Sequence, residues 1–198
     1  KKITVLISNK GAGTNLQAII DGVESGKIDA QIISVISDTS DAPGLERARK
    51  HNLPVEICPD KEDLLTVLQK LNPDYICLGG WKQVITDDVL NQFENRILNV
   101  HPGLIPGTID GNVKSPDGTE ALWNKGKFTD AAMESFLNNN ATYAGSSIHF
   151  LTKEFDFGPV LQRGFVKVLP DDTVESLYAR VKQKENEMYV EVLAKLCK

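Results

Sequence analysis

Residues 3–26 read ITVLISNKGAGTNLQAIIDGVESG, and this stretch decides the fold. Its first six residues are mostly β-branched or aliphatic, which favours a short buried strand. A turn containing two glycines follows, and the aliphatic residues after it recur at the spacing of an amphipathic helix. Strand, glycine turn and helix in this order predict the first unit of an α/β fold.

The same alternation of strand and helix continues to residue 102. Further strands are expected at residues 31–38, 54–58, 74–80 and 97–102, and helices at 42–51, 60–71 and 86–96. Near-continuous apolar runs are typical of parallel strands that are covered on both faces. Five strands alternating with four helices predict a doubly wound, mostly parallel and twisted Rossmann-like sheet. In such a sheet, ligands bind at the carboxyl ends of the strands.

The pattern changes after Gly107, where the chain becomes polar and irregular. Short helices are expected around residues 119–126 and 129–137. Residues 143–152 and 159–169 have the composition of strands joined by a short loop, which predicts a C-terminal β-hairpin extension. Residues 172–196 then form a long amphipathic helix with Thr173 or Asp172 as its cap.

Composition excludes several classes of protein. The chain has 198 residues, 41% hydrophobic and 25% charged, so it can bury roughly 70% of its unfolded surface in one domain. A net charge of -5 without a Lys/Arg cluster gives little support for binding to nucleic acid. No run approaches the ~20 apolar residues of a membrane span, and the scattered histidines lack metal-ligand spacing. We expect a cytoplasmic protein with no metal, nucleic-acid or membrane partner.

The glycine turn is a candidate phosphate site. Gly11–Asn15 follow a strand and open a helix, so their backbone N–H groups and the helix N-terminus could bind an anion. The dinucleotide fingerprint requires glycine where Leu16 stands, which disfavours a nicotinamide cofactor, although Asp38 could still serve a ribose. The structural alternative is a turn that serves only tight folding.

The strand at residues 97–102 carries candidate catalytic groups. Asn99 and His101 are two residues apart, so their side chains share one face, and Pro102 and Gly103 then end the strand. One imidazole and one amide donor are the minimal equipment for acyl transfer, because they supply a proton carrier and an oxyanion donor. A polar pair with only a structural role is the alternative.

Two further residues could support this histidine. Asp156 lies in the expected hairpin loop, where aspartate commonly serves only the turn. A carboxylate beside His101 would favour the imidazolium and orient the ring. His149 lies in the preceding strand, and a supporting role and a structural role are equally open for it.

Motifs along nearly the whole chain resemble those of the phosphoribosylglycinamide formyltransferases, within the folate-dependent formyltransferase superfamily. They are GAGTNLQAII, LGGW, LNVHPGLIP, SSIHFLT with the following EFDFGPV, and DTVESLYARVKQKE. The resemblance implies transfer of a formyl group from the co-substrate 10-formyltetrahydrofolate to the amine of glycinamide ribonucleotide, in purine biosynthesis. It implies no metal, and a monomer or homodimer.

The resemblance also implies roles for individual residues. The catalytic residues would be Asn99, His101 and Asp156. The ribonucleotide would contact Gly11, Ala12, Gly13, Thr14, Asn15 and Glu185, the first five through its phosphate. The folate would contact Lys61, Trp81, Lys82, Gln83, Val84, Ile85, Lys153, Glu154 and Phe155. One formyltransferase domain, residues 1–198, would comprise a phosphate- and nucleotide-binding half (1–100) and a folate and catalytic half (101–198).

The chain departs from the family pattern at several positions. Gln83 and Lys61 stand where the family has arginines, Gly103 stands where it usually has serine, and Asn9 and Lys10 lengthen the phosphate loop. Neither glutamine nor lysine has the charged bidentate fork of arginine. A related formyltransferase or deformylase, an enzyme with another amine acceptor, and a non-catalytic nucleotide- or folate-binding protein therefore remain alternatives.

Overall fold

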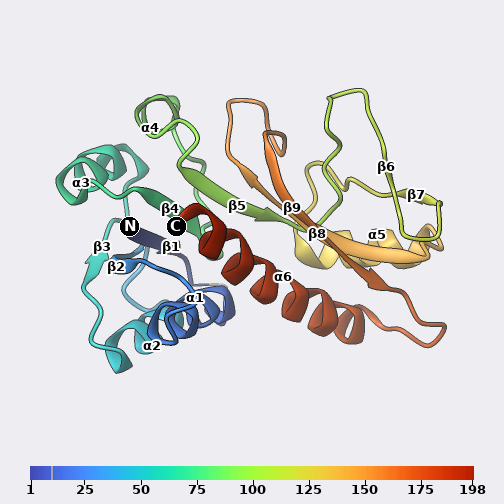
Figure 1. The fold of residues 1–198 in the computed structure, drawn as a ribbon, viewed down its shortest axis with the longest axis horizontal. Coiled ribbons are helices and arrows are strands. Elements are labelled where there is room, and N and C mark those ends of the chain that lie inside the picture. Colours follow the sequence, from blue (N-terminus) through green and yellow to red (C-terminus); the bar gives the residue numbers. More distant parts are fainter. Residues whose placement is uncertain (10) are drawn as a thin grey trace. The chain divides into compact units, whose positions relative to one another are not determined.

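The computed structural model describes residues 1–9 and 11–198 (Figure 1). Lys10, one of the two residues expected to lengthen the glycine loop, lies outside the described residues. The chain divides into two compact units. The first unit comprises Lys1–Asn99 and Tyr189–Lys198, and the second comprises Val100–Met188.

The first unit is built on a parallel sheet with strand order β3-β2-β1-β4-β5 (Figure 1). Its strands are β1 (Lys2–Ile7), β2 (Gln31–Ser37), β3 (Val55–Ile57), β4 (Tyr75–Leu78) and β5 (Ile97–His101). Val5 of β1 pairs with Val35 on one side and Cys77 on the other, and all three side chains are fully buried. The strand order reverses at β1 and β4, and the glycine loop follows β1 there. This is the position where a doubly wound sheet binds ligands.

The crossover helices of the first unit form two pairs. They are α1 (Thr14–Glu24), α2 (Gly44–Lys50), α3 (Leu64–Leu71), which a short 3-10 helix η1 (Lys61–Asp63) precedes, and α4 (Asp87–Gln92). α1 packs beside α2, and α3 packs beside α4. Leu16, Ile19 and Ile20 of α1 are buried, as their helical spacing predicts.

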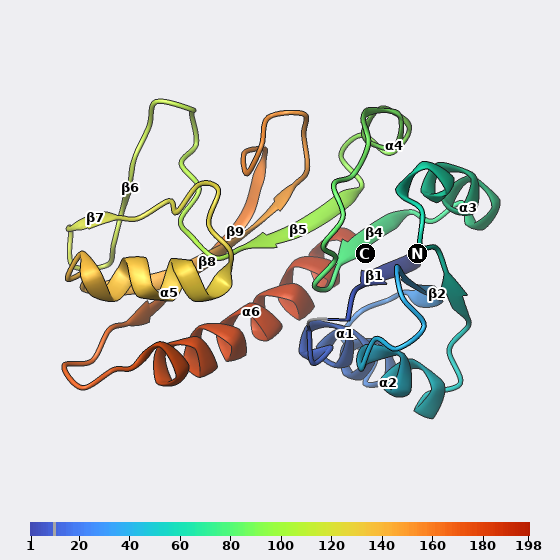
Figure 2. The same ribbon diagram turned by 180° about the vertical axis from the view of Figure 1, so that it is seen from behind.

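The second unit contains an antiparallel hairpin of β8 (Tyr143–Phe150) and β9 (Val160–Lys167). The end of β5 adjoins β8 in the strand order β5-β8-β9. Helix α5 (Thr129–Asn138) packs against β8 (Figure 2). Its Met133 and Phe136 are fully buried with Leu177 of the long helix α6 (Val174–Leu196). The sheet, the hairpin extension and the long C-terminal helix confirm the predicted fold class.

The expected helix at residues 119–126 is wrong. Glu120–Ala121 form strand β7 instead, which pairs with β6 (Val113–Lys114) in a small antiparallel ladder. Gly118 has φ +84°, which fits the tight turn between the two strands. The Leu122 carbonyl then accepts a hydrogen bond from Leu104 N–H (2.9 Å). Part of this segment's backbone bonding is therefore directed to other strands and loops rather than to a helical turn.

Both ends of α6 are fixed. Ser176 N–H donates to Thr173 Oγ1 (3.2 Å), and Thr173 N–H donates to Ser176 Oγ (3.0 Å). Of the two predicted caps, Thr173 and Asp172, Thr173 therefore caps the helix reciprocally. In the first unit, the buried Tyr189 hydroxyl donates to the carbonyl of Leu78 at the end of β4 (2.8 Å). Among the helices of residues 1–9 and 11–198, none combines the length and the apolar character that crossing a bilayer requires.

Candidate active site

The end of β5 presents the candidate histidine. Asn99 ends the Lys1–Asn99 segment of the first unit and is half-buried, whereas His101 in the second unit is 2% exposed. Strand alternation places their side chains on the same face of β5. Gly103 N–H donates to the His101 carbonyl (2.8 Å), which turns the chain immediately after the strand.

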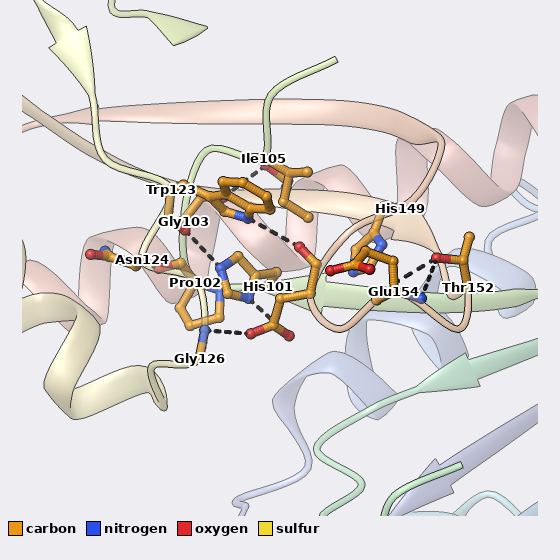
Figure 3. Close-up of polar contacts among 12 residues, drawn as sticks. His101, Pro102, Gly103, Ile105, Trp123, Asn124, Gly126, His149, Thr152 and Glu154 are labelled. Carbon is orange, nitrogen blue, oxygen red and sulfur yellow. Dashed lines mark hydrogen bonds and ion pairs between the residues drawn. The ribbon is translucent and has the colours of Figure 1, made fainter. Parts of the chain in front are cut away.

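Both ring nitrogens of His101 face acceptors (Figure 3). Nε2 lies 2.8 Å from the main-chain carbonyl oxygen of Trp123, and because a carbonyl only accepts, Nε2 is the donor. Nδ1 lies 3.6 Å from Asp156 Oδ1, which is an ion-pair separation and too long for a hydrogen bond. His101 is thus oriented by a tight bond at Nε2, and Nδ1 faces a carboxylate.

Gly103 permits this arrangement. A Cβ atom at position 103 would lie 1.8 Å from the Trp123 carbonyl oxygen, which is the oxygen that accepts from His101. A serine there would force the Trp123 backbone away from the imidazole. The close approach of two backbone segments therefore explains glycine at position 103, where the resemblance predicts serine.

Asp156 is held as a carboxylate. It occupies the loop between β8 and β9 with φ +49°, and its Oδ2 accepts a hydrogen bond from Gly126 N–H (2.7 Å). Partial burial raises the pKa of Asp156, but His101, the Gly126 N–H and His149 together outweigh it and bring the pKa below its ordinary value. Asp156 is therefore ionised at neutral pH and places a negative charge beside His101 Nδ1.

His149 is a neutral neighbour of this pair. It is fully buried on β8, and its Nδ1 donates to the Phe150 carbonyl (3.0 Å). Burial and the nearby His101 lower the pKa of His149 to about 4, although the Phe150 carbonyl and Asp156 oppose them. His149 carries no charge at pH 7, so its ring does not neutralise the Asp156 carboxylate. His101 is the histidine whose Nδ1 faces that carboxylate.

This burial predicts a stability that depends on pH. Between about pH 6.5 and pH 4, the unfolded His149 binds a proton and the folded His149 does not, so acid favours unfolding. We expect the free energy of unfolding to fall by about 3 kcal/mol across this window, because each unit of pKa shift corresponds to about 1.4 kcal/mol. Urea unfolding at several pH values measures this loss.

His149→Gln is expected to flatten the same curve, and His51→Gln serves as the control because it removes a histidine that is less buried. The lowered pKa of Asp156 means that its carboxylate stabilises the folded protein above the ordinary pKa of an aspartate. This contribution to stability is lost only at lower pH, so it affects the acid end of the curve. An unchanged acid loss in His149→Gln would contradict the assignment.

In the first unit, the glycine loop is braced from α2. Gly13 precedes α1 with φ +71°, and a Cβ there would lie 2.9 Å from Gly44 Cα. Only glycine fits these two conditions. Arg47 of α2 donates from Nε to the Ala12 carbonyl (2.9 Å), which fixes the loop and brings a positive charge to it.

The start of α1 has unsatisfied polar groups. No side chain in the described part of the chain caps this helix. The buried atoms Thr14 Oγ1 and Asn15 Oδ1 have no hydrogen-bond partner among the described residues. Buried polar groups are normally satisfied, so these groups and the helix N-terminus indicate a site for a polar, anionic ligand.

Ser8 joins three strand ends and was missed by sequence reasoning. Its hydroxyl donates to Asp38 Oδ2 (2.7 Å) after β2 and accepts from Lys82 N–H (3.0 Å) after β4. Asp38 Oδ1 is buried without a partner among the described residues. A single serine after β1 carries no sequence signal of its own, since the contacts arise from the strand order.

The residues expected at the folate divide between the two units. In the first, Lys61, Lys82 and Val84 are exposed, and Trp81 and Ile85 are buried. Gln83 Nε2 donates to the Pro59 carbonyl (2.8 Å), so this residue ties two loops together instead of presenting a charge. In the second, Lys153, Glu154 and Phe155 are exposed in the β8–β9 loop.

Glu185 is buried on α6 of the second unit, where both carboxylate oxygens have partners. Oε1 accepts from the Ser146 hydroxyl (2.7 Å), and Oε2 accepts from Lys182 Nζ (2.9 Å). The carboxylate is thus held in one orientation, and a carboxylate can still accept further bonds from ligand hydroxyls.

Comparison with known proteins agrees with this arrangement. The formyl transferase family model matches residues 1–193. The chain is 34% identical to phosphoribosylglycinamide formyltransferase of Haemophilus influenzae, covering 96% of this chain and 84% of that protein. It is 30% identical to the chloroplastic phosphoribosylglycinamide formyltransferase of Arabidopsis thaliana, over 100% of this chain and 65% of that protein. The chain thus spans slightly less than two thirds of the plant protein.

A solved structure shows the same fold. The glycinamide ribonucleotide transformylase 1 of Symbiobacterium toebii superposes with a TM-score of 0.81 at 34% identity, covering 99% of this chain and 87% of that chain. Sequence and structure thus agree over almost the whole chain. The chain therefore belongs to the formyl transferase family.

Proposed function

We propose that the protein transfers a formyl group from 10-formyltetrahydrofolate to the primary amine of glycinamide ribonucleotide, a step of purine biosynthesis. The observation that carries the proposal is the buried His101 beside an ionised Asp156 at the end of β5. A structural polar pair does not require a carboxylate at an imidazole nitrogen. The relatives named phosphoribosylglycinamide formyltransferase support the choice of both substrates.

Each residue of the proposed catalytic trio has one task. The substrate amine attacks the formyl carbon and forms a new C–N bond, while the Asn99 amide and protonated His101 stabilise the oxyanion. Because Nε2 is committed to the Trp123 carbonyl, Nδ1 is the nitrogen that exchanges a proton with the reacting atoms. Asp156 stabilises the imidazolium. The intermediate collapses when the C–N bond to the folate breaks and the amine's proton passes to the departing nitrogen.

The ribonucleotide phosphate is assigned to the loop Gly11–Asn15. The start of α1 and the Thr14 hydroxyl, which have no side-chain cap and no hydrogen-bond partner among residues 1–9 and 11–198, supply donors. Arg47 adds a positive charge to the loop. Glu185, with its fixed carboxylate, is assigned to the ribonucleotide hydroxyls.

The folate is assigned to the exposed loop Lys153–Phe155 and to the segment Trp81–Ile85 with Lys61. Gln83 makes a loop-to-loop hydrogen bond where the family has an arginine, so we expect folate affinity to rest on the remaining contacts. No metal enters the proposed reaction. The single formyltransferase domain, the cytoplasmic location and the monomeric or homodimeric state stay predictions.

The test is product formation by the purified protein with both substrates present. Formylated glycinamide ribonucleotide confirms the proposal. Formate released without the acceptor indicates a deformylase, and transfer only to other amines indicates a changed acceptor. Calorimetric titration with each substrate alone separates binding from turnover, so binding without turnover identifies a nucleotide- or folate-binding protein and contradicts the proposal.

A further inference from the structure

Trp123 contacts both members of the His101–Asp156 pair. Its main-chain carbonyl accepts from His101 Nε2 (2.8 Å). Its indole Nε1–H donates to the main-chain carbonyl of Asp156 (3.0 Å). One residue thus fixes the imidazole with its backbone and the Asp156 loop with its side chain.

Neighbouring contacts strengthen the same connection. Gly126 N–H donates to the Asp156 carboxylate (2.7 Å), and Lys125 Nζ pairs with Glu154 Oε1 (2.8 Å). The Trp123 ring packs against Phe157, with ring centroids 5.8 Å apart. The segment 123–126 is therefore bound to the loop 154–157 through main-chain, charged and aromatic contacts.

We propose that Trp123 is a positioning residue of the reaction, which sets the separation between His101 and Asp156 through its carbonyl and its indole N–H. This inference rests on the proposed function, in which that pair carries the proton. Asp156 has φ +49°, a left-handed conformation that aspartate adopts in turns. The indole bond to the Asp156 carbonyl restrains this turn.

The proposal predicts a change in the titration of Asp156. The groups that face its carboxylate are His101 from β5, His149 from β8 and the Gly126 N–H, while Lys125 and Glu154 are paired with each other. If the loop loosens, His101 and Gly126 act less on Asp156. The pKa of Asp156 then rises toward its ordinary value, and the acid limb of kcat moves to higher pH.

The decisive variant is Trp123→Phe, which keeps an aromatic ring and the main-chain carbonyl but removes the N–H donor. Replacement of Trp123 by benzothienylalanine is a second, nearly isosteric version. We expect kcat to fall about 10-fold, the effect of one lost hydrogen bond, with KM for both substrates within about twofold. Tyr143→Phe is the matched control, because it removes a polar hydrogen from an aromatic ring that packs against Phe165 instead.

Two readouts separate this inference from the proposed function. The Asp156 carboxyl carbon is followed by 13C NMR without substrate, and its titration should move to higher pH in Trp123→Phe but not in Tyr143→Phe. An unmoved titration overturns the positioning role, even if kcat falls, and an unchanged kcat overturns its consequence for the reaction. Wild-type protein without turnover contradicts the proposed function instead, while the titration still decides whether Trp123 sets the pair.

Discussion

Replacing His101 with alanine is expected to lower kcat by about 100- to 10,000-fold, the range for removing a positioned general acid or base. The side chain is buried at the end of β5, and it is bound at Nε2 and charge-paired at Nδ1. His149 beside it has a pKa of about 4 and is neutral at pH 7, so it does not supply the imidazolium that the proposed mechanism uses. Single-turnover formation of the formylated ribonucleotide measures the loss.

The same change should leave substrate binding largely intact. His101 is assigned to the oxyanion and the proton, which develop only in the transition state, so KM should change much less than kcat. His51→Ala is the control, because His51 lies at the end of α2 and pairs with Glu24. A His101→Ala protein that is folded and retains more than a tenth of wild-type kcat would contradict the assignment.

Much of the first unit could be predicted from its sequence because its signals are local. Aliphatic runs of strand length, helical spacing after the glycine loop and the end of β5 at His101 depend on neighbours within a few residues. The identification of His101 and Asp156 as a pair needed more than pattern. Aspartate in a loop usually has only a turn role. Asp156 does occupy a turn, with φ +49°, so its residue type and position do not reveal that it also faces His101.

Trp123 and Gly126, which sequence reasoning missed, each use a backbone group to contact the His101–Asp156 pair. Trp123 binds His101 with a carbonyl that every residue possesses, and Gly126 binds Asp156 with an N–H that almost every residue possesses. Such contacts leave no mark on residue type. The expected helix at residues 119–126 hid them further, because a helix would have used those backbone groups internally. Gly103 does record the contact in the sequence, because any side chain at that position would collide with the Trp123 carbonyl.

Replacing Asn99 with alanine is expected to lower kcat by about 100- to 1000-fold, the usual cost of removing one oxyanion donor. The half-buried side chain leaves β5 on the same face as His101, so the two can act on one developing oxyanion. KM should change little, and thermal unfolding should show a folded protein. Asn91→Ala on the exposed surface of α4 is the matched control.

A shared oxyanion also constrains the double variant. If Asn99 and His101 stabilise the same charge, the loss in Asn99→Ala/His101→Ala should be smaller than the product of the two single losses, since residues that act as a unit are not additive. Independent roles would instead give a loss equal to that product. An Asn99→Ala protein within threefold of wild type would remove Asn99 from the mechanism and leave His101, set by Trp123 and Asp156, as the group that must handle both the oxyanion and the proton.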